Sequence, residues 1–187
     1  MARASASIEP YVALLRGINV GGRNLLPMAE LVELFAAEGC AQVRTYVQSG
    51  NVLFRASRPL AARLPGRIAA AVAERKGFAV PVVLRTAREL QAVLAGSPFV
   101  VRGAAAEALH VLFLAGRPAP ARVATLDQGR SPPDEFAVRG REVYLCLPTG
   151  VARTKLTNAY FDTRLGTTST MRNWQTVARL AELALES

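Results

Sequence analysis

Apolar and polar positions in the first half of the chain follow the periods of strands and helices in turn. Short apolar runs that end at glycine or at serine-glycine are typical of strands and hairpins. Apolar side chains at helical spacing, opened by proline and closed by glycine, are typical of amphipathic helices. A capping box at Thr86-Ala87-Arg88-Glu89 predicts a further short helix that ends near Gly96. The expected strands are 11–18, 43–48, 51–55 and 80–85. The expected helices are 27–38, with Gly39 just past its end, and 59–76, which is interrupted or kinked at Pro65-Gly66.

The second half of the chain repeats this pattern except at its end. An apolar strand, a helix that opens at a proline and a hairpin around Gly140 are followed by two helices. The last helix is expected to be capped by Thr170 or a neighbouring residue, with Trp174 on its apolar face. In this order the final helix stands where a fourth strand would be. The expected strands are 109–115, 135–139 and 142–147, and the expected helices are 118–126, 154–165 and a C-terminal helix.

The order β-α-β-β-α-β in the first half is that of the ferredoxin-like plait. We therefore predict an α+β protein with two tandem ferredoxin-like lobes. Each lobe is expected to be an antiparallel sheet with helices packed on one face, and an extra helix is expected at the C-terminus. Residues 1–10 are predicted to form a disordered tail, residues 11–97 the first lobe with its short helix, and residues 98–187 a plait-like second lobe with the order β-α-β-β-α-α.

Glycine and asparagine gather in two loops of the first lobe. The first and second strands of a plait run parallel, so the loop 17–24 and the hairpin 48–51 are expected at the same end of the sheet. Backbone amides, side-chain amides and guanidinium groups there can hold an anion or a polar small molecule. The glycine spacing matches neither a Walker loop nor a dinucleotide fingerprint, and turn asparagines often bond their own backbone instead. The candidate ligand-binding residues are Arg16, Asn19, Gly21, Gly22, Arg23, Asn24, Gln48, Ser49 and Asn51.

A second candidate region lies near the C-terminus. Lys155 and Asn158 are three residues apart and share a face of the expected helix. A hydroxyl-rich run then leads into the last helix, whose first turn is expected to carry Arg172 and Asn173. The N-terminus of a helix, together with nearby hydroxyl groups and a guanidinium, can bind a phosphate. The alternative is that one hydroxyl only caps the helix while Trp174 lies in the core. The candidates here are Lys155, Asn158, Thr170, Arg172 and Asn173.

Composition narrows the choice of partners. The net charge of +9 favours anionic partners such as nucleic acid or phosphates, although the charge is nearly all arginine and is scattered along the chain. No apolar run is long enough for a membrane helix and no signal peptide is evident, so we expect a cytoplasmic protein without membrane contact. Cys40 and Cys146 lack metal-ligand spacing, and His110, the only histidine, lies in an apolar strand. No metal, cofactor or assembled acid–base pair is expected, and enzymatic activity is left open.

Four spaced motifs carry a family resemblance. The chain resembles the bacterial family called domain of unknown function 1697 over about residues 11–183. The resemblance implies the two-lobed plait and no established activity. Departures from the family pattern are Arg23 in place of lysine, Met171 in place of a threonine, Thr154 in place of serine, and Pro65-Gly66. The motifs are Leu15-Arg16-Gly17-Ile18-Asn19-Val20-Gly21-Gly22, Thr45-Tyr46-Val47-Gln48-Ser49-Gly50-Asn51-Val52, Lys155-Leu156-Thr157-Asn158 with Phe161, and Arg172-Asn173-Trp174-Gln175-Thr176.

Three classes of function stay open at this point. The first is binding of a small anionic or nucleotide-like ligand at the Gly/Asn/Gln-rich loops. The second is nucleic-acid binding by one face of the 43–55 hairpin, which requires that face to be exposed. The third is a structural or interaction role, in which the open sheet face of each lobe is covered by the other lobe or by a second subunit of an oligomer. The hairpin face would present Arg44, Tyr46, Gln48, Asn51, Leu53 and Arg55.

Overall fold

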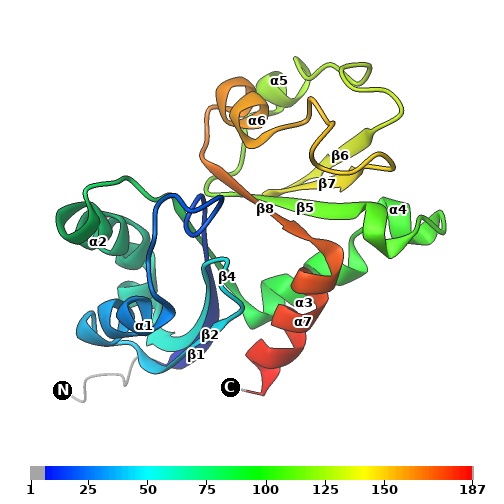
Figure 1. Ribbon diagram of the computed structural model, residues 1–187. Helices are drawn as coiled ribbons and strands as arrows, with labels where there is room; N and C mark the ends of the chain where they lie inside the picture. Colours follow the sequence, from blue (N-terminus) through cyan, green and yellow to red (C-terminus); the bar gives the residue numbers. More distant parts are fainter. Residues whose placement is uncertain (1–6, 187) are drawn as a thin grey trace. The chain divides into compact units, whose positions relative to one another are not determined.

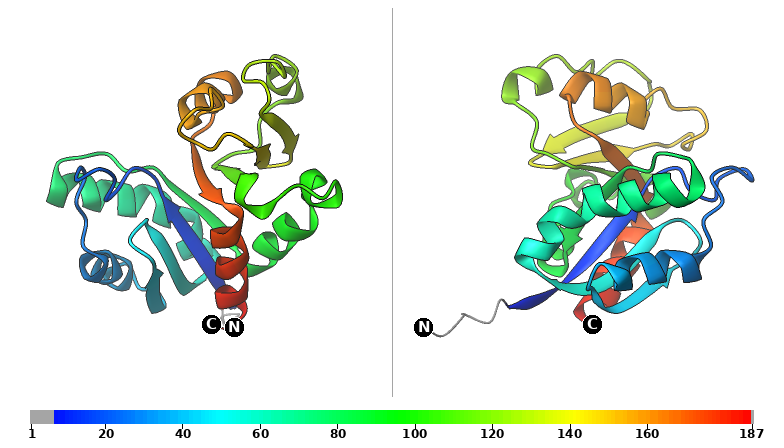
Figure 2. Two further views of the ribbon diagram at one scale, coloured as in Figure 1. Left: turned by 45° about the vertical axis from the view of Figure 1, so that its right-hand side comes forward. Right: turned by 90° about the vertical axis from the view of Figure 1, so that its left-hand side faces the viewer.

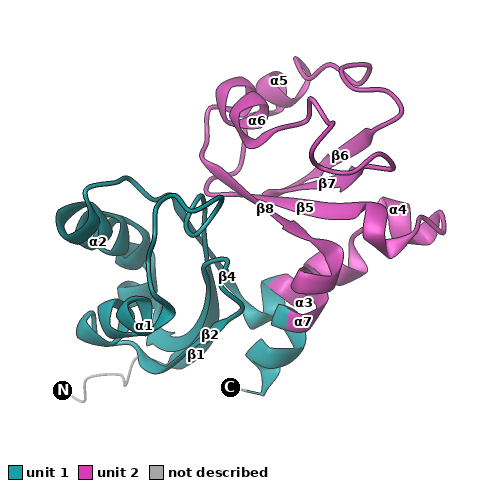
Figure 3. Cartoon of the chain, viewed as in Figure 1, with its two compact units in different colours: residues 1–89, 180–187 teal, residues 90–179 magenta. Residues whose placement is uncertain are grey.

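Two four-stranded antiparallel sheets, each with helices packed on it, form the computed structural model, which describes residues 7–186 (Figure 1). The chain divides into two compact units. Unit 1 holds the residues up to Glu89 together with those from Leu180 onward, and unit 2 holds Leu90–Arg179 (Figure 3). The α+β class and the two ferredoxin-like sheets agree with the prediction from the sequence.

Unit 1 has the complete plait order. Its sheet runs β2-β3-β1-β4, and β1 is antiparallel to both of its neighbours. Helices α1 and α2 cover one face of this sheet (Figures 1 and 2). Phe35 of α1 and Phe54 of β3 meet there with ring centroids 5.1 Å apart. The elements are β1 Ile8–Leu15, α1 Met28–Ala37, β2 Ala41–Tyr46, β3 Asn51–Ser57, α2 Arg58–Lys76, β4 Val82–Thr86 and α3 Ala87–Ala95.

Two expectations for unit 1 are corrected. Strand β1 begins at Ile8, so the predicted tail 1–10 is wrong for residues 8–10, while residues 1–6 lie outside the described part. The reason is that β3 continues to Ser57, which gives Ile8 a partner in the ladder. Helix α2 also runs through Pro65 without a break, because packing of its apolar face against the sheet outweighs the one lost hydrogen bond.

Unit 2 repeats the order of unit 1, with its sheet running β6-β7-β5-β8. This corrects the predicted order β-α-β-β-α-α, because Ser169–Asn173 forms a fourth strand, β8, that pairs with β5. The hydroxyl-rich sequence of this segment predicts the start of a helix, but the segment pairs with β5 as a strand. The elements are α4 Pro98–Val101, a 3₁₀ turn Ala106–Ala108, β5 Leu109–Leu114, α5 Pro120–Val123, β6 Glu135–Arg139, β7 Glu142–Cys146, α6 Asn158–Leu165, β8 Ser169–Asn173 and α7 Trp174–Leu185.

The second face of each sheet is also buried. In unit 1, Val12 and Leu53 on this face are buried, and Arg44 Nη2 donates to the Leu183 carbonyl of α7 at 2.5 Å. In unit 2, the Tyr144 hydroxyl donates to the Val93 carbonyl of α3 at 3.1 Å. Helices α3 and α7 each begin in one unit and end in the other, whereas the sequence suggested a boundary at 97/98.

Candidate functional site

The loop that follows β1 folds into a miniature hairpin. Arg23 N donates to the Val20 carbonyl at 3.0 Å, and Asn19 N donates to the Asn24 carbonyl at 3.1 Å. Between them, Gly21 and Gly22 have φ of 57° and 73°, as the two central residues of a type I′ turn require. Both glycines have open space where a Cβ would stand, so backbone conformation alone selects glycine here.

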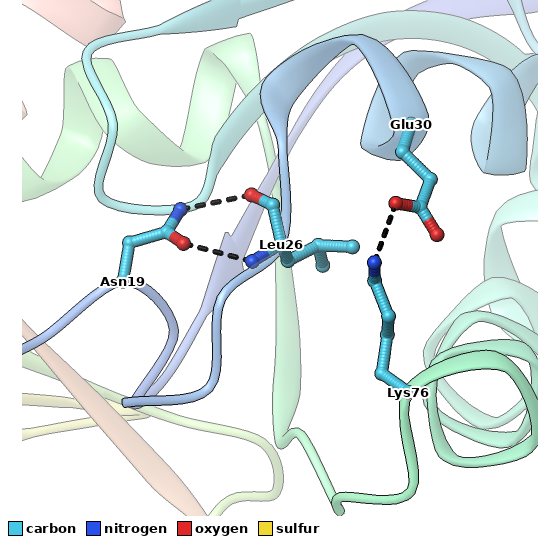
Figure 4. A network of polar contacts seen from close by, with 4 residues as sticks. All are labelled: Asn19, Leu26, Glu30 and Lys76. Atoms are coloured by element: carbon cyan, nitrogen blue, oxygen red, sulfur yellow. Dashed lines mark hydrogen bonds and ion pairs between the residues drawn. The ribbon is translucent and has the colours of Figure 1, made fainter. Parts of the chain in front are cut away.

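The side chain of Asn19 joins this hairpin to two other segments. Its Oδ1 accepts from Leu26 N at 2.8 Å, and its Nδ2 lies 2.9 Å from the Leu26 carbonyl (Figure 4). The same Nδ2 is 3.1 Å from the Gln48 carbonyl in the turn between β2 and β3. Leu15 N also donates to the Gly50 carbonyl at 2.8 Å. The predicted juxtaposition of the 17–24 loop with the 48–51 turn is thus confirmed.

The other two asparagines also bond to the loops in which they lie. Asn24 Nδ2 donates to the Gly17 carbonyl at 2.8 Å. Asn51 is fully buried, and its Nδ2 is 3.1 Å from the Tyr46 carbonyl and 2.9 Å from Ser49 Oγ. These bonds match the alternative in which turn asparagines bond their own backbone. The three amides therefore shape the loops.

The β2–β3 turn has four residues, 47–50, rather than the two predicted, because the pairing ends at Tyr46 and Asn51. Gly50 has φ of 75°, and a Cβ there would stand 2.9 Å from that of Leu15. Conformation and close approach to β1 both require glycine. Val47 has φ of 50°, which is a true outlier for a β-branched residue.

Other groups at this end of the sheet face solvent. Gly21, Gly22 and Arg23 are exposed, and Arg16 is half-buried. Within residues 7–186, neither Gly21 N–H nor Gly22 N–H donates a hydrogen bond. No acidic residue occurs in 10–29 or in 39–57, so the local field is positive.

An ion pair joins α2 to α1, the helix that follows the candidate loop. Lys76 Nζ, in the last turn of α2, lies 2.7 Å from Glu30 Oε2, in the first turn of α1 (Figure 4). Each side chain has a quarter of its surface exposed. Each charge also suits the dipole at its end of a helix. The pair fixes the start of α1, directly after the loop that carries the candidate residues.

The second candidate region does not form one site, because its residues lie on both faces of a strand. Asn158 Nδ2 donates to Ser169 Oγ at 2.9 Å, and Ser169 Oγ donates to Asp162 Oδ1 at 2.5 Å, on the face that α6 covers. Thr170 and Arg172 lie on the opposite face of β8, since successive strand residues alternate. Lys155 is exposed in the loop before α6.

The sequence predicts a phosphate site at the N-terminus of the last helix. This is corrected, because the hydroxyl-rich residues Ser169–Asn173 form strand β8. Arg172 Nη1 donates to Thr170 Oγ1 and to the Met171 carbonyl, both at 2.8 Å. Asn173, and not a hydroxyl, caps α7, because its Oδ1 accepts from Thr176 N at 2.8 Å. Burial lowers the pKa of Arg172 to about 10, which still leaves it charged at neutral pH.

Sequence reasoning missed Arg85, the largest fully buried side chain. Arg85 in β4 pairs with Val12, and Arg172 in β8 pairs with Val111, so the two arginines occupy equivalent strand positions. Each donates Nη1 to the carbonyl of the residue before it, at 2.7 Å for Arg85. Each also directly precedes the residue that caps the following helix. The available signal was an arginine inside an apolar strand just ahead of a capping box.

Both cysteines are buried. Burial raises the pKa of the Cys40 thiol to about 11 and also raises that of Cys146, which disfavours the reactive thiolate. Among residues 7–186, no three or more His, Cys, Asp or Glu side chains gather as a metal site. In the same range no helix combines the length and apolar character that crossing a bilayer requires.

The sheet face proposed to bind nucleic acid is covered only in part. Leu53 and Asn51 on the β2–β3 hairpin are buried, whereas Arg44 and Gln48 are exposed, and Arg44 Nη2 donates to the Leu183 carbonyl of α7. An RNA-recognition sheet needs an open face on which bases stack. The buried part of this face does not offer such a surface.

Comparison with known proteins agrees with this fold. The family model described as "Protein of unknown function (DUF1697)" matches residues 8–144. The solved structure of the conserved bacterial protein SP0830 from Streptococcus pneumoniae is similar, with a TM-score of 0.70 and 23% sequence identity. The match covers 95% of this chain and 99% of that chain. No curated protein matches the chain.

Proposed function

Since the chain belongs to the DUF1697 family, whose function is unknown, its role has to be argued from its own residues, and we propose that it binds a small anionic ligand at the Gly21-Gly22 turn. The observation that carries the proposal is the Asn19 side chain, which holds this turn in place while the N–H groups of both glycines find no partner in the described part of the chain. Backbone N–H groups in a fixed turn form a concave site for an anion.

The arginines beside the turn supply the charge. Arg23 directly follows Gly22 and is exposed, and within residues 7–186 its guanidinium makes no hydrogen bond or ion pair. Its planar guanidinium can donate two parallel hydrogen bonds to a phosphate or carboxylate. Arg16 lies at the other end of the same loop and adds to the positive field. In this proposal Arg23 and the glycine N–H groups contact the ligand, whereas Asn19, Asn24 and Asn51 are positioning residues.

Backbone strain in the same loops supports a functional role. Asn19, Asn24 and Val47 have φ between 50° and 54°. Left-handed conformations of non-glycine residues cost about 1–3 kcal/mol in the less tolerant cases and tend to gather at functional sites. Valine is the least tolerant of the three because its Cβ is branched. A loop that served only as a connection would not need this strain.

A binding measurement with defined anions tests the proposal. Inorganic phosphate, pyrophosphate, AMP and ATP would be titrated by calorimetry at about 150 mM salt, where nonspecific attraction is screened. We expect one of them to bind, and Arg23→Ala to weaken that binding at least tenfold, because a charge-assisted bidentate contact contributes about 1.5–3 kcal/mol.

The matched control is Arg63→Ala, which removes one exposed positive charge from α2 and should leave the affinity within about twofold. Arg23→Lys should recover only part of the affinity, since lysine lacks the fork geometry. Equal losses in Arg23→Ala and Arg63→Ala would show that binding follows net charge alone. No binding of any of the four anions would count against a phosphate-type ligand.

A second candidate, a protein-interaction role, is favoured by a different observation. Val20, Leu25 and Val47 are 66%, 63% and 52% exposed. Each directly neighbours a residue that the Asn19 amide network holds, so the three residues lie in loops that this network joins. Exposed apolar side chains gathered in this way are typical of interaction surfaces. Val20→Ser combined with Leu25→Ser would impair such a role while leaving anion binding by Arg23 intact.

A further inference from the structure

A buried carboxylate oxygen in unit 2 has no hydrogen-bond partner. Asp134, directly before β6, is 5% exposed, and its Oδ2 accepts a hydrogen bond of 2.8 Å from Ser131 Oγ. Its Oδ1 is the one buried side-chain nitrogen or oxygen of the described residues that lacks a partner. Such atoms are rare in folded proteins, and each calls for a water, an ion or a proton.

Of the two side-chain oxygens of Asp134, only Oδ2 has a hydrogen-bond partner. Lys155 N donates to Ser131 Oγ at 3.0 Å, and the Ser131 hydroxyl in turn donates to Oδ2. Within residues 7–186, Asp134 makes no ion pair with lysine, arginine or histidine. Carboxylates in protein interiors are normally paired with a cation or coordinate a metal ion. A water would satisfy Oδ1 but would not supply a counterion.

We propose that Asp134 Oδ1 binds a small monovalent cation, Na⁺ or K⁺. The side chains linked to this carboxylate carry hydroxyl oxygens, because Ser131 Oγ bonds to Asp134 Oδ2 and Thr154 Oγ1 lies 3.5 Å from Ser131 Oγ. Hard cations prefer such ligands. One carboxylate balances one positive charge, whereas a divalent ion would leave excess charge in a buried site. The cation would tie the loop before β6 to the loop before α6, which carries Lys155.

Thermal unfolding at constant ionic strength tests the proposal. Tetramethylammonium chloride would be replaced stepwise by NaCl or by KCl, and the Tm followed. Tetramethylammonium is much bulkier than Na⁺ or K⁺ and presents only methyl groups to an oxygen ligand. We expect the Tm to rise by about 3–5 °C for each tenfold increase of the inorganic cation above its Kd. The cation that raises the Tm more steeply with concentration is the preferred ion.

Asp134→Asn keeps the shape of the side chain, removes its charge and should abolish this rise. The control Glu107→Gln removes an exposed negative charge from the same unit and should retain it. A wild-type Tm that is the same in all three salts, or a rise that survives in Asp134→Asn, would overturn the proposal and leave water as the occupant.

A structural measurement keeps the proposal testable if Asp134→Asn does not fold. Crystals of the wild-type protein grown with thallium(I), a heavy analogue of K⁺, should show an anomalous peak beside Asp134 Oδ1. Thr154→Val, which removes a neighbouring hydroxyl but no charge, should weaken the peak and the Tm response. A crystal with no anomalous signal at this place would refute cation binding.

Discussion

Asn19, Asn24 and Asn51 each direct a side-chain amide at backbone carbonyls near the end of the first sheet. Asparagine suits this task because its short amide imitates a backbone group and tolerates positive φ. Two of the three, Asn19 and Asn24, have φ of 54° and 51°. Their influence on any ligand is therefore indirect, through the shape of the turn that presents Gly21, Gly22 and Arg23.

At this scale we predict that Asn51→Ala destabilises unit 1 by about 2–3 kcal/mol. The fully buried amide holds the Tyr46 carbonyl and Ser49 Oγ, and its loss leaves buried polar groups unsatisfied as well as a cavity. Urea unfolding measures the effect as a lower midpoint at an unchanged slope. The control Gln48→Ala, at an exposed neighbour in the same turn, should change stability by less than about 0.5 kcal/mol. Equal stability of the two variants would contradict a structural role for Asn51.

At the scale of elements, β4 with α3 and β8 with α7 are built alike. In both, a strand carries a buried or half-buried arginine, and the next residue caps the helix that follows. Thr86 and Glu89 form the predicted capping box, because each side chain accepts from the backbone N–H of the other residue, at 2.7 and 3.1 Å. Asn173 serves α7 through a single bond to Thr176 N.

We expect loss of either cap to have a similar, moderate effect. Thr86→Ala and Asn173→Ala should each lower stability by about 1 kcal/mol, the usual contribution of an N-cap side chain. Thermal unfolding followed by circular dichroism provides the measurement. Thr149→Ala, an exposed loop position, is the control and should leave the Tm unchanged. Should Thr86→Ala behave like this control, the capping box contributes nothing measurable to the fold.

At the scale of the whole molecule, the inner strands β1, β3, β5 and β7 are mostly buried, whereas no residue of the edge strand β2 is. With a net charge of +9 and one histidine, few groups titrate near neutral pH. His110, half-buried on β5, is the main exception, because burial lowers its pKa.

This shift predicts that stability falls as the pH decreases below about 6.5. Because the folded-state pKa of His110 is the lower one, the unfolded chain binds more protons between the two values. The contribution is complete above the unfolded pKa and is lost on acidification, with a slope of at most about 1.4 kcal/mol per pH unit. Urea midpoints between pH 5 and 7 measure this slope, and His110→Gln should flatten it. The same slope in His110→Gln would mean that carboxyl groups cause it.

Local patterns in the sequence determined the element types of unit 1, the capping box at Thr86 and the meeting of the two glycine-rich loops. Each of these follows from residue periods, turn chemistry and the strand order of a plait. Only the tertiary structure decided that Ser169–Asn173 is a strand, because its polar residues become a ladder only when β5 lies beside them. It also decided that Asn51 and Arg85 are buried and that the candidates near the C-terminus lie on opposite faces of β8. Burial depends on contacts with segments that are distant in the sequence. A local sequence pattern does not predict those contacts.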